Sequence, residues 1–249
     1  MAHDTTVRWS KEYCTQCILY IMMSEYLNRL IIPENIKHIK IDVGLGQFNI
    51  NSTNWLKTEK DLLVIMFDPN ADSINHSLNI MVTNNVGKPN NNMYYIIPVA
   101  LSNTESPTKM DFYKMSADAG TSSLYNPIDP TLGPIKEKTT VDTYSLKHFF
   151  DVFPWDRFEY IEYIKIDAQG SDFDIIKGAG SYLMDRVMYI TAEPEDGQYE
   201  NCAHNTSENM EQYLLSLNFI KIDHPNTRDP TFLNKKFLHL QDSTYIFQI

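Results

Sequence analysis

Short apolar runs alternate along the chain with amphipathic stretches, and several of these runs end in an acidic residue. The clearest runs cover residues 39–43, 62–67, 94–101, 161–166 and 187–192. Runs of this length, rich in β-branched residues and bounded by turn residues, predict buried strands. Because helical segments separate them, we predict an α/β fold with a mostly parallel sheet of about seven strands.

Apolar positions at helical spacing predict the segments between the strands. The expected helices cover residues 10–30, 48–56, 71–78 and 145–153, the segment after Ser171, and the segment holding Met210, Leu214 and Leu217. Ser171 and Asp174 have the spacing of a capping box. At the end of the chain, residues 219–222 and 244–249 predict a closing antiparallel pair.

Region 102–141 breaks the alternation of strands and helices. Residues 109–115 and 138–144 alternate between polar and apolar, and prolines and glycines punctuate the segment between them. A β-hairpin that leaves the main sheet fits this pattern, and such loops often cover or shape a site. A surface loop without a functional role fits the pattern equally well. A chain of 249 residues suits one large domain. We therefore expect a single domain over 1–249, with a helical lead-in at 1–36 and the insertion at 102–141.

Charge and apolar content narrow the function classes. The formal net charge is −11, which disfavours nucleic acid as a partner because phosphate contacts need basic surfaces. No apolar run reaches the length of a membrane span, and no secretion signal is visible. Three cysteines, an odd number, suit a reducing compartment, so we expect a cytoplasmic protein. Cys14 and Cys17 have CxxC spacing, but without a second pair we favour half-buried thiols over a metal or redox site.

The candidate chemistry lies at the ends of the predicted strands. Asp42 ends the first strand and is followed by Gly44 and Gly46, and Asp68 ends the second. Asp167 and Glu193 end two later strands. In an open parallel sheet these ends meet at one edge, so we expect the carboxylates to gather around one crevice. Glycines there would let the backbone approach a ligand, and Asp68 could hold a ribose diol by two hydrogen bonds.

The glycine turn does not match a dinucleotide site. That fingerprint has a third glycine, where this chain has Asn49, and no lysine or arginine in the turn could assist a pyrophosphate. A ligand with a ribose and a positive charge, but without phosphates, suits an acid-rich crevice better. S-adenosylmethionine is such a ligand.

The order of these segments resembles that of FkbM-type methyltransferases, from about Lys40 to Ile222. The segments that carry the resemblance are Ile41-Asp42-Val43-Gly44-Leu45-Gly46-Gln47, Phe67-Asp68-Pro69-Asn70, Val99-Ala100-Leu101-Ser102, Ser122-Ser123-Leu124, Ile164-Lys165-Ile166-Asp167-Ala168-Gln169-Gly170 and Ala192-Glu193. The most specific of them is the Lys165–Gly170 segment, which an acid and a helix follow.

The resemblance implies a Rossmann-like class I methyltransferase sheet, a closing antiparallel strand and flanking helices. It implies O-methylation of a hydroxyl on a small molecule, sugar or glycan, with S-adenosylmethionine as the donor. On that basis Asp42, Gly44 and Gly46 would line the methionine end of the cofactor, and Asp68 would take the ribose hydroxyls. The matched segments also place four residues among the cofactor-binding candidates: Gln47, Pro69, Asn70 and Ser102.

A sugar hydroxyl is a weak nucleophile near neutral pH, so a base or a metal should assist its attack. Asp167 is the first candidate for a base, because its strand should neighbour the first strand, and Glu193 is the second. Together they could also hold one hard divalent cation, Mg²⁺ or Mn²⁺, through oxygen atoms. Lys165 is expected to be a packing or pairing residue. Lone histidines near helix ends are more often structural, so no histidine enters the catalytic set.

Two other function classes stay open at this point. An NAD-type oxidoreductase could use the same sheet, although it would need the third turn glycine. A module that binds nucleotides or partners without catalysis could keep the fold and lose the chemistry. It would bind the cofactor without turnover.

Overall fold

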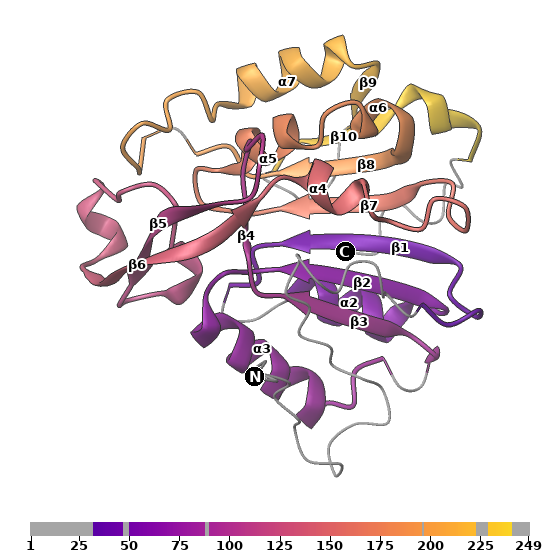
Figure 1. Ribbon diagram of the computed structural model, residues 1–249, viewed down its shortest axis with the longest axis horizontal. Coiled ribbons are helices and arrows are strands. Elements are labelled where there is room, and N and C mark those ends of the chain that lie inside the picture. The colour runs from indigo at the N-terminus through magenta and orange to yellow at the C-terminus, as the bar shows by residue number, and fades with distance from the viewer. Residues whose placement is uncertain (1–31, 47–49, 88–89, 196, 223–228, 241–249) are drawn as a thin grey trace, which may run out of the picture.

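A computed structural model describes residues 32–46, 50–87, 90–195, 197–222 and 229–240 of the chain. A central sheet runs through the molecule with helices on both faces, and a smaller sheet stands at one end of it (Figure 1). Within the described ranges, no helix has both the length and the apolar character that crossing a membrane requires.

The main sheet has seven strands in the order β3-β2-β1-β7-β8-β10-β9. Their bounds are β1 His38–Val43, β2 Leu62–Phe67, β3 Met93–Ile97, β7 Ile161–Ile166, β8 Val187–Ala192, β9 Phe219–Ile222 and β10 Thr231–Asn234. Strands β1, β2, β3, β7 and β8 pair in parallel, whereas β10 is antiparallel to both of its neighbours. The predicted α/β class, with its mostly parallel sheet and antiparallel closing strand, is confirmed.

Alternation along the strands divides the core between the two faces of the sheet. In β2, Leu63, Ile65 and Phe67 join the larger apolar cluster, and Leu62, Val64 and Met66 join the cluster on the opposite face. Every residue of β2 is buried, which explains why its sequence is an unbroken apolar run.

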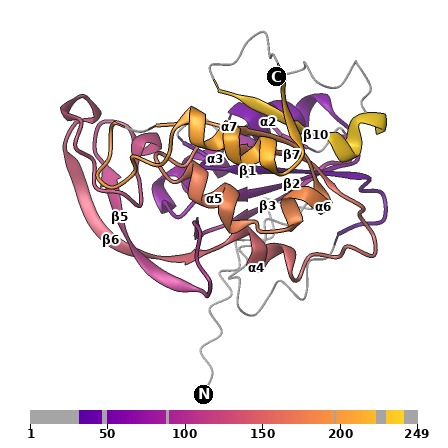
Figure 2. The same ribbon diagram turned by 90° about the horizontal axis from the view of Figure 1, so that it is seen from above.

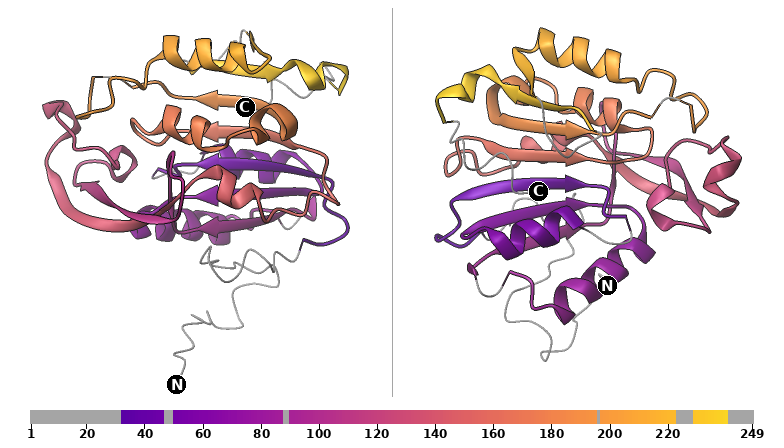
Figure 3. Two further views of the ribbon diagram at one scale, coloured as in Figure 1. Left: turned by 45° about the horizontal axis from the view of Figure 1, so that its top comes forward. Right: turned by 180° about the vertical axis from the view of Figure 1, so that it is seen from behind.

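The helices cover the two faces unequally (Figures 2 and 3). On the larger cluster lie α4 Leu146–Phe150, α5 Asp172–Gly178, α6 Tyr182–Arg186 and α7 Ser207–Ser216. On the other face lie α2 Ile50–Thr58 and α3 Ala71–Thr83. The expected leading helix at 10–30, like Cys14 and Cys17, lies outside the described residues.

The predicted hairpin is confirmed. Strands β5 Thr108–Met115 and β6 Ile135–Tyr144 pair in antiparallel fashion and curve away from the main sheet (Figure 2). Short 3₁₀ segments, η3 Ala119–Thr121 and η4 Pro130–Leu132, lie between them, and η5 Lys235–Leu240 follows β10. The small sheet is completed by β4 Ala100–Leu101, which pairs with β6.

Two expectations about the elements need correction. The apolar run 94–101 is two strands in two sheets: β3 ends at Ile97, and the chain turns at Pro98, which has no N–H to continue a ladder. In the described structure β9 pairs with β10, and the predicted partner of β9, residues 244–249, lies outside the described residues. Ser171 makes no capping hydrogen bond, since its backbone is already helical.

Candidate active site

The glycine turn after β1 is shaped by the neighbouring strand. Gly44 has φ +82°, and a Cβ atom built on it would lie 1.8 Å from the backbone oxygen of Asp167. The backbone N–H of Asp167 in turn donates to the Val43 carbonyl at 2.9 Å. Only glycine lets the ends of β1 and β7 approach this closely. Gly46, with φ +56°, faces Gly120 of η3 instead: its Cβ would meet the Gly120 Cα at 3.9 Å.

Two buried carboxylates hold the backbone around this turn. Asp68 accepts hydrogen bonds from the N–H of Leu45 at 2.9 Å and of Asn70 at 2.7 Å. Asp42 accepts from both the N–H and the hydroxyl of Ser52, at 3.2 and 2.5 Å, in the first turn of α2. Burial raises the pKa of Asp42 and of Asp68 to about 6, although these hydrogen bonds oppose the shift.

Two adjoining cavities open beside the turn. Residues lining the Asp68 cavity include Phe67, Asp68, Pro69, Asn70, Val99, Leu101, Phe112, Ser122 and Ser171. Residues lining the Asp42 cavity include Asp42, Leu45, Asn51, Asp118, Thr121 and Gln169. Both cavities share Gly44, Gly46, Gly120 and Asp167, so they meet where η3 approaches the glycine turn. None of the residues lining either cavity, within the described ranges, is a lysine or an arginine.

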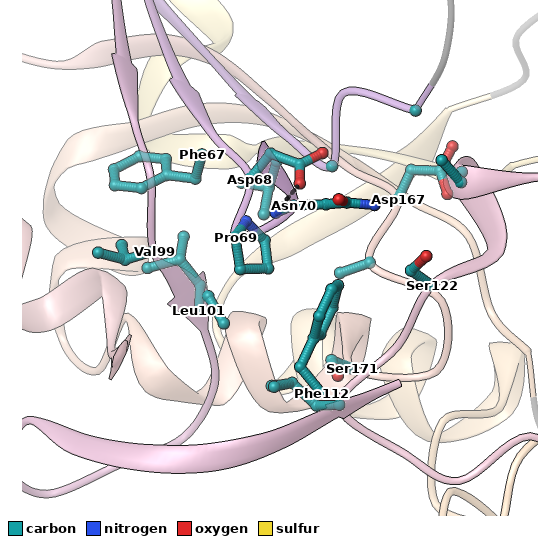
Figure 4. Close-up of a pocket in the computed structure, with 18 residues that line it drawn as sticks. Phe67, Asp68, Pro69, Asn70, Val99, Leu101, Phe112, Ser122, Asp167 and Ser171 are labelled. Atoms are coloured by element: carbon teal, nitrogen blue, oxygen red, sulfur yellow. Dashed lines mark hydrogen bonds between the residues drawn. The ribbon is translucent and has the colours of Figure 1, made fainter. Parts of the chain in front are cut away.

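Figure 4 shows how the Asp68 cavity combines an apolar and a polar side. The Phe112 ring points from β5 toward the centre, with Pro69 and Leu101 on one side and Ser122 on the other. The carboxylates of Asp68 and Asp167 lie at the opposite end from Phe112 (Figure 4). A ligand here would therefore meet aromatic and aliphatic surface along one edge and hydrogen-bond acceptors along another.

Asp167 is more accessible than the buried Asp42 and Asp68, with 38% of its side chain exposed. Its Oδ1 accepts from the Gln169 amide at 2.8 Å, and its Oδ2 lies 3.7 Å from the Lys165 ammonium. Lys165 also pairs with Asp229 at 3.2 Å. The expectation that Lys165 is a pairing residue is confirmed.

Glu193 neighbours Asp167 and does not line either cavity in the described structure. Desolvation, the charge of Asp167 and a hydrogen bond to it raise the pKa of Glu193 to about 8. The burial of Glu193 and the neighbouring charge of Asp167 thus favour its protonated form. Buried Asp172 accepts from the N–H of Glu193 at 3.1 Å, and burial together with Asp167 raises its pKa to about 8.

The structure thus brings most of the predicted site residues together. Asp42, Gly44, Gly46, Asp68, Pro69, Asn70 and Asp167 line the joined cavities. Gln47 lies outside the described residues. Ser102 lines neither cavity: its N–H donates to the Tyr144 carbonyl at 2.8 Å, and its own carbonyl lies against Gly178. Ser102 therefore lies beside the second sheet and outside both cavity linings, and its role in cofactor binding stays a prediction.

Several lining residues carried little local signal. Phe112, Asp118 and Gly120 come from the hairpin, far along the chain from the glycine turn. The only hint was the general expectation that an inserted loop shapes a site. Ser122, which the family resemblance included, does line the Asp68 cavity.

The comparisons with known proteins place the chain in a family. The model described as "Methyltransferase FkbM domain" matches residues 30–221. Neither the curated proteins nor the solved structures gave a match.

Proposed function

The chain belongs to the FkbM methyltransferase family, and we propose that it transfers the methyl group of S-adenosylmethionine to a hydroxyl of a sugar or glycan. In this proposal the sheet and the 102–141 hairpin work as a single domain. The hairpin supplies a wall of the cofactor site.

One observation carries the choice of cofactor: acid side chains and no lysine or arginine line the two joined cavities within the described ranges. A pyrophosphate would place two negative charges beside Asp42, Asp68 and Asp167; the nearby Lys165 ammonium is paired with Asp167 and Asp229 and is not among the residues that line either cavity. A sulfonium and an ammonium would instead be attracted to these carboxylates. This arrangement supports S-adenosylmethionine over NAD, the cofactor of the alternative oxidoreductase reading.

The shapes of the cavities suggest which part of the donor each would hold. The Asp68 cavity, with Phe67, Leu101 and Phe112, suits an adenosine. Each Asp68 oxygen accepts one backbone N–H and keeps a second lone pair that a ribose hydroxyl can use. The Asp42 cavity, with Asn51 and Gln169, suits the amino-acid end. The methyl group would then lie near Gly44 and Asp167, where the cavities meet.

Asp167 is our candidate for the general base. Gln169 and Lys165 hold its carboxylate in place, and Asp167 lines both cavities. Glu193 shares a proton with it, so the pair would act as one unit and Asp167 would take the hydroxyl proton as the methyl group is transferred. In-line placement of the hydroxyl against the methyl–sulfur bond would supply much of the remaining rate enhancement.

A divalent cation on Asp167 and Glu193 is the second candidate for activating the hydroxyl. Mg²⁺ or Mn²⁺ would have to replace the proton that the two carboxylates share. Full turnover after exhaustive treatment with EDTA would exclude this version and leave the base mechanism.

The experiment that tests the proposal compares ligands by thermal denaturation. At a hundredfold excess over its dissociation constant, a ligand stabilises the native state by about 2.7 kcal/mol, or about 5–10 °C in Tm for a chain of this size. We expect S-adenosylhomocysteine to give this shift and NAD to give none. If NAD alone shifts the melt, the proposal is wrong. Binding of S-adenosylhomocysteine without methyl transfer to any sugar or small hydroxyl compound would favour the non-catalytic module.

A further inference from the structure

A second cluster of ionisable side chains lies at the opposite edge of the sheet from the glycine turn. His38 begins β1, Glu59 follows α2, and Glu162 is near the start of β7. The His38 Nδ1 atom and one carboxylate oxygen of each glutamate all lie within 4.8 Å of one another. Among the described residues, these are the three whose histidine, cysteine or carboxylate ligand atoms converge in this way.

Lys40 divides the oxygens of the two glutamates into two sets. Its ammonium lies 2.6 Å from Oε1 of Glu59 and 3.3 Å from Oε1 of Glu162. The two Oε2 atoms face His38 instead. The His38 Nδ1 atom lies 3.7 Å from Oε2 of Glu59 and 2.6 Å from Oε2 of Glu162. Three potential ligand atoms therefore face one another on the side away from the lysine.

The histidine is oriented as a metal ligand would be. Its Nε2 atom lies 2.8 Å from the Lys60 carbonyl oxygen. A carbonyl oxygen can only accept, so Nε2 carries a proton and Nδ1 is the nitrogen that faces the two glutamates. Metal-binding histidines commonly have their second nitrogen held in this way by a backbone carbonyl. At Nδ1, a cation would take the place of the proton that now joins His38 to Glu162.

Buried atoms without partners supply the independent observation. The Glu59 side chain is only 9% exposed, and its Oε2 has no hydrogen-bond partner among the described residues. The hydroxyl of Tyr189 is likewise buried without a hydrogen-bond partner in the described structure. Tyr189 lines the same cavity as His38 and Glu162. A buried carboxylate oxygen without a donor is costly unless a cation or a donor reaches it.

We propose that His38, Glu59 and Glu162 bind one divalent first-row cation of the Zn²⁺ class. One imidazole nitrogen and two carboxylate oxygens form a ligand set that Zn²⁺ accepts. The adjoining cavity leaves a position for water as the fourth ligand. The ion would join β1, β7 and the loop before β2 at the edge farthest from the methyl-transfer site, so its role is to stabilise the sheet. The proposal is independent of the proposed function.

The test uses the full chain with Cys14 and Cys17 changed to serine, because free thiols bind Zn²⁺ themselves. Calorimetry with Zn²⁺ should show one equivalent, and Co²⁺ should give the visible absorption of a low-coordinate site. At a hundredfold excess over its dissociation constant, Zn²⁺ should raise Tm by about 5 °C or more.

His38→Gln and Glu162→Gln should each weaken Zn²⁺ binding by about a hundredfold or more, since each removes a direct ligand. His148→Gln is the matched histidine control, because His148 belongs to the cap of α4. Glu211→Gln is the matched carboxylate control, because Glu211 pairs with Lys221 on the surface at 2.6 Å and belongs to neither site. Both controls should bind Zn²⁺ as the parent chain does.

Absence of saturable binding to the parent chain, or parent-like binding to His38→Gln, would overturn the proposal. If the His38 and Glu162 variants do not fold, X-ray absorption of the Zn²⁺-loaded parent chain decides. One imidazole with oxygen ligands supports the site; two or more imidazoles, or any sulfur, reject it.

Discussion

Replacing Gly44 with alanine tests the close approach of β1 and β7 that positions the whole site. A Cβ atom there would lie 1.8 Å from the Asp167 carbonyl oxygen, which is a backbone atom and cannot rotate away. To reach an acceptable contact of about 3.0 Å, one strand end would have to move by roughly 1.2 Å. Overpacking of this kind costs about 1–3 kcal/mol. The left-handed backbone adds about 1–2 kcal/mol for any side chain, so the total loss should be about 2–5 kcal/mol.

Gly46→Ala is the matched control within the same turn. Its backbone is also left-handed, but the new Cβ would meet the Gly120 Cα at 3.9 Å, an ordinary van der Waals contact. Its expected cost is therefore the conformational part alone, about 1–2 kcal/mol. Urea denaturation of the two variants, with unchanged m-values, measures the difference directly.

The two variants should also differ in function. Gly44→Ala should lose stability and S-adenosylhomocysteine binding together, because Asp167 moves with the end of β7. Gly46→Ala should keep most of its stability and lose ligand binding, because its new methyl group stands where the two cavities meet. Equal free energies of unfolding for the two variants would refute the argument from the Asp167 contact.

Three further predictions follow from the site. Asp68→Ala should abolish S-adenosylhomocysteine binding in calorimetry, because the Leu45 and Asn70 N–H groups lose their acceptor and the ribose loses its partner; wild-type affinity would contradict this role. Asp167→Ala should spare binding and reduce kcat by about 10²–10⁴-fold, and equal loss of binding in both variants would show that the two roles are misassigned. The free energy of unfolding should fall as pH rises from about 5 to about 8. The pKa values of Asp42 and Asp68 are raised to about 6 and that of Asp172 to about 8. In this range the native state therefore holds protons that the unfolded chain has released. Urea denaturation across this range checks the sign, and Asp172→Asn should flatten the upper half of the profile; a rise in stability toward pH 8 would refute it.

Local sequence patterns were sufficient to predict the parallel strands of the main sheet and the acidic residues at their ends. An apolar run such as β2 and a glycine turn such as Gly44–Gly46 depend on residues close in sequence. Parallel strands then bring their carboxyl ends to one edge, which is why Asp42, Asp68 and Asp167 were predicted to meet and do meet.

Long-range partners were not predictable in the same way. The strand β10, which lies between β8 and β9, was not predicted from the sequence. The positions of Phe112 and Gly120 in the lining of the two cavities depend on how the hairpin curves, which no local pattern encodes. The convergence of His38, Glu59 and Glu162 has the same origin, since these residues come from three separate elements.

The sequence by itself determined the fold class, the family and the edge of the sheet where the chemistry lies. Tertiary structure alone decided that Gly44 is needed for contact with Asp167, and that Ser102 and Glu193 are not among the residues lining the two cavities. It also decided the protonation of the acids, because a pKa depends on burial and on neighbouring charges. Periodicity is a property of neighbours along the chain, whereas distance, burial and charge pairing exist only once remote segments pack together.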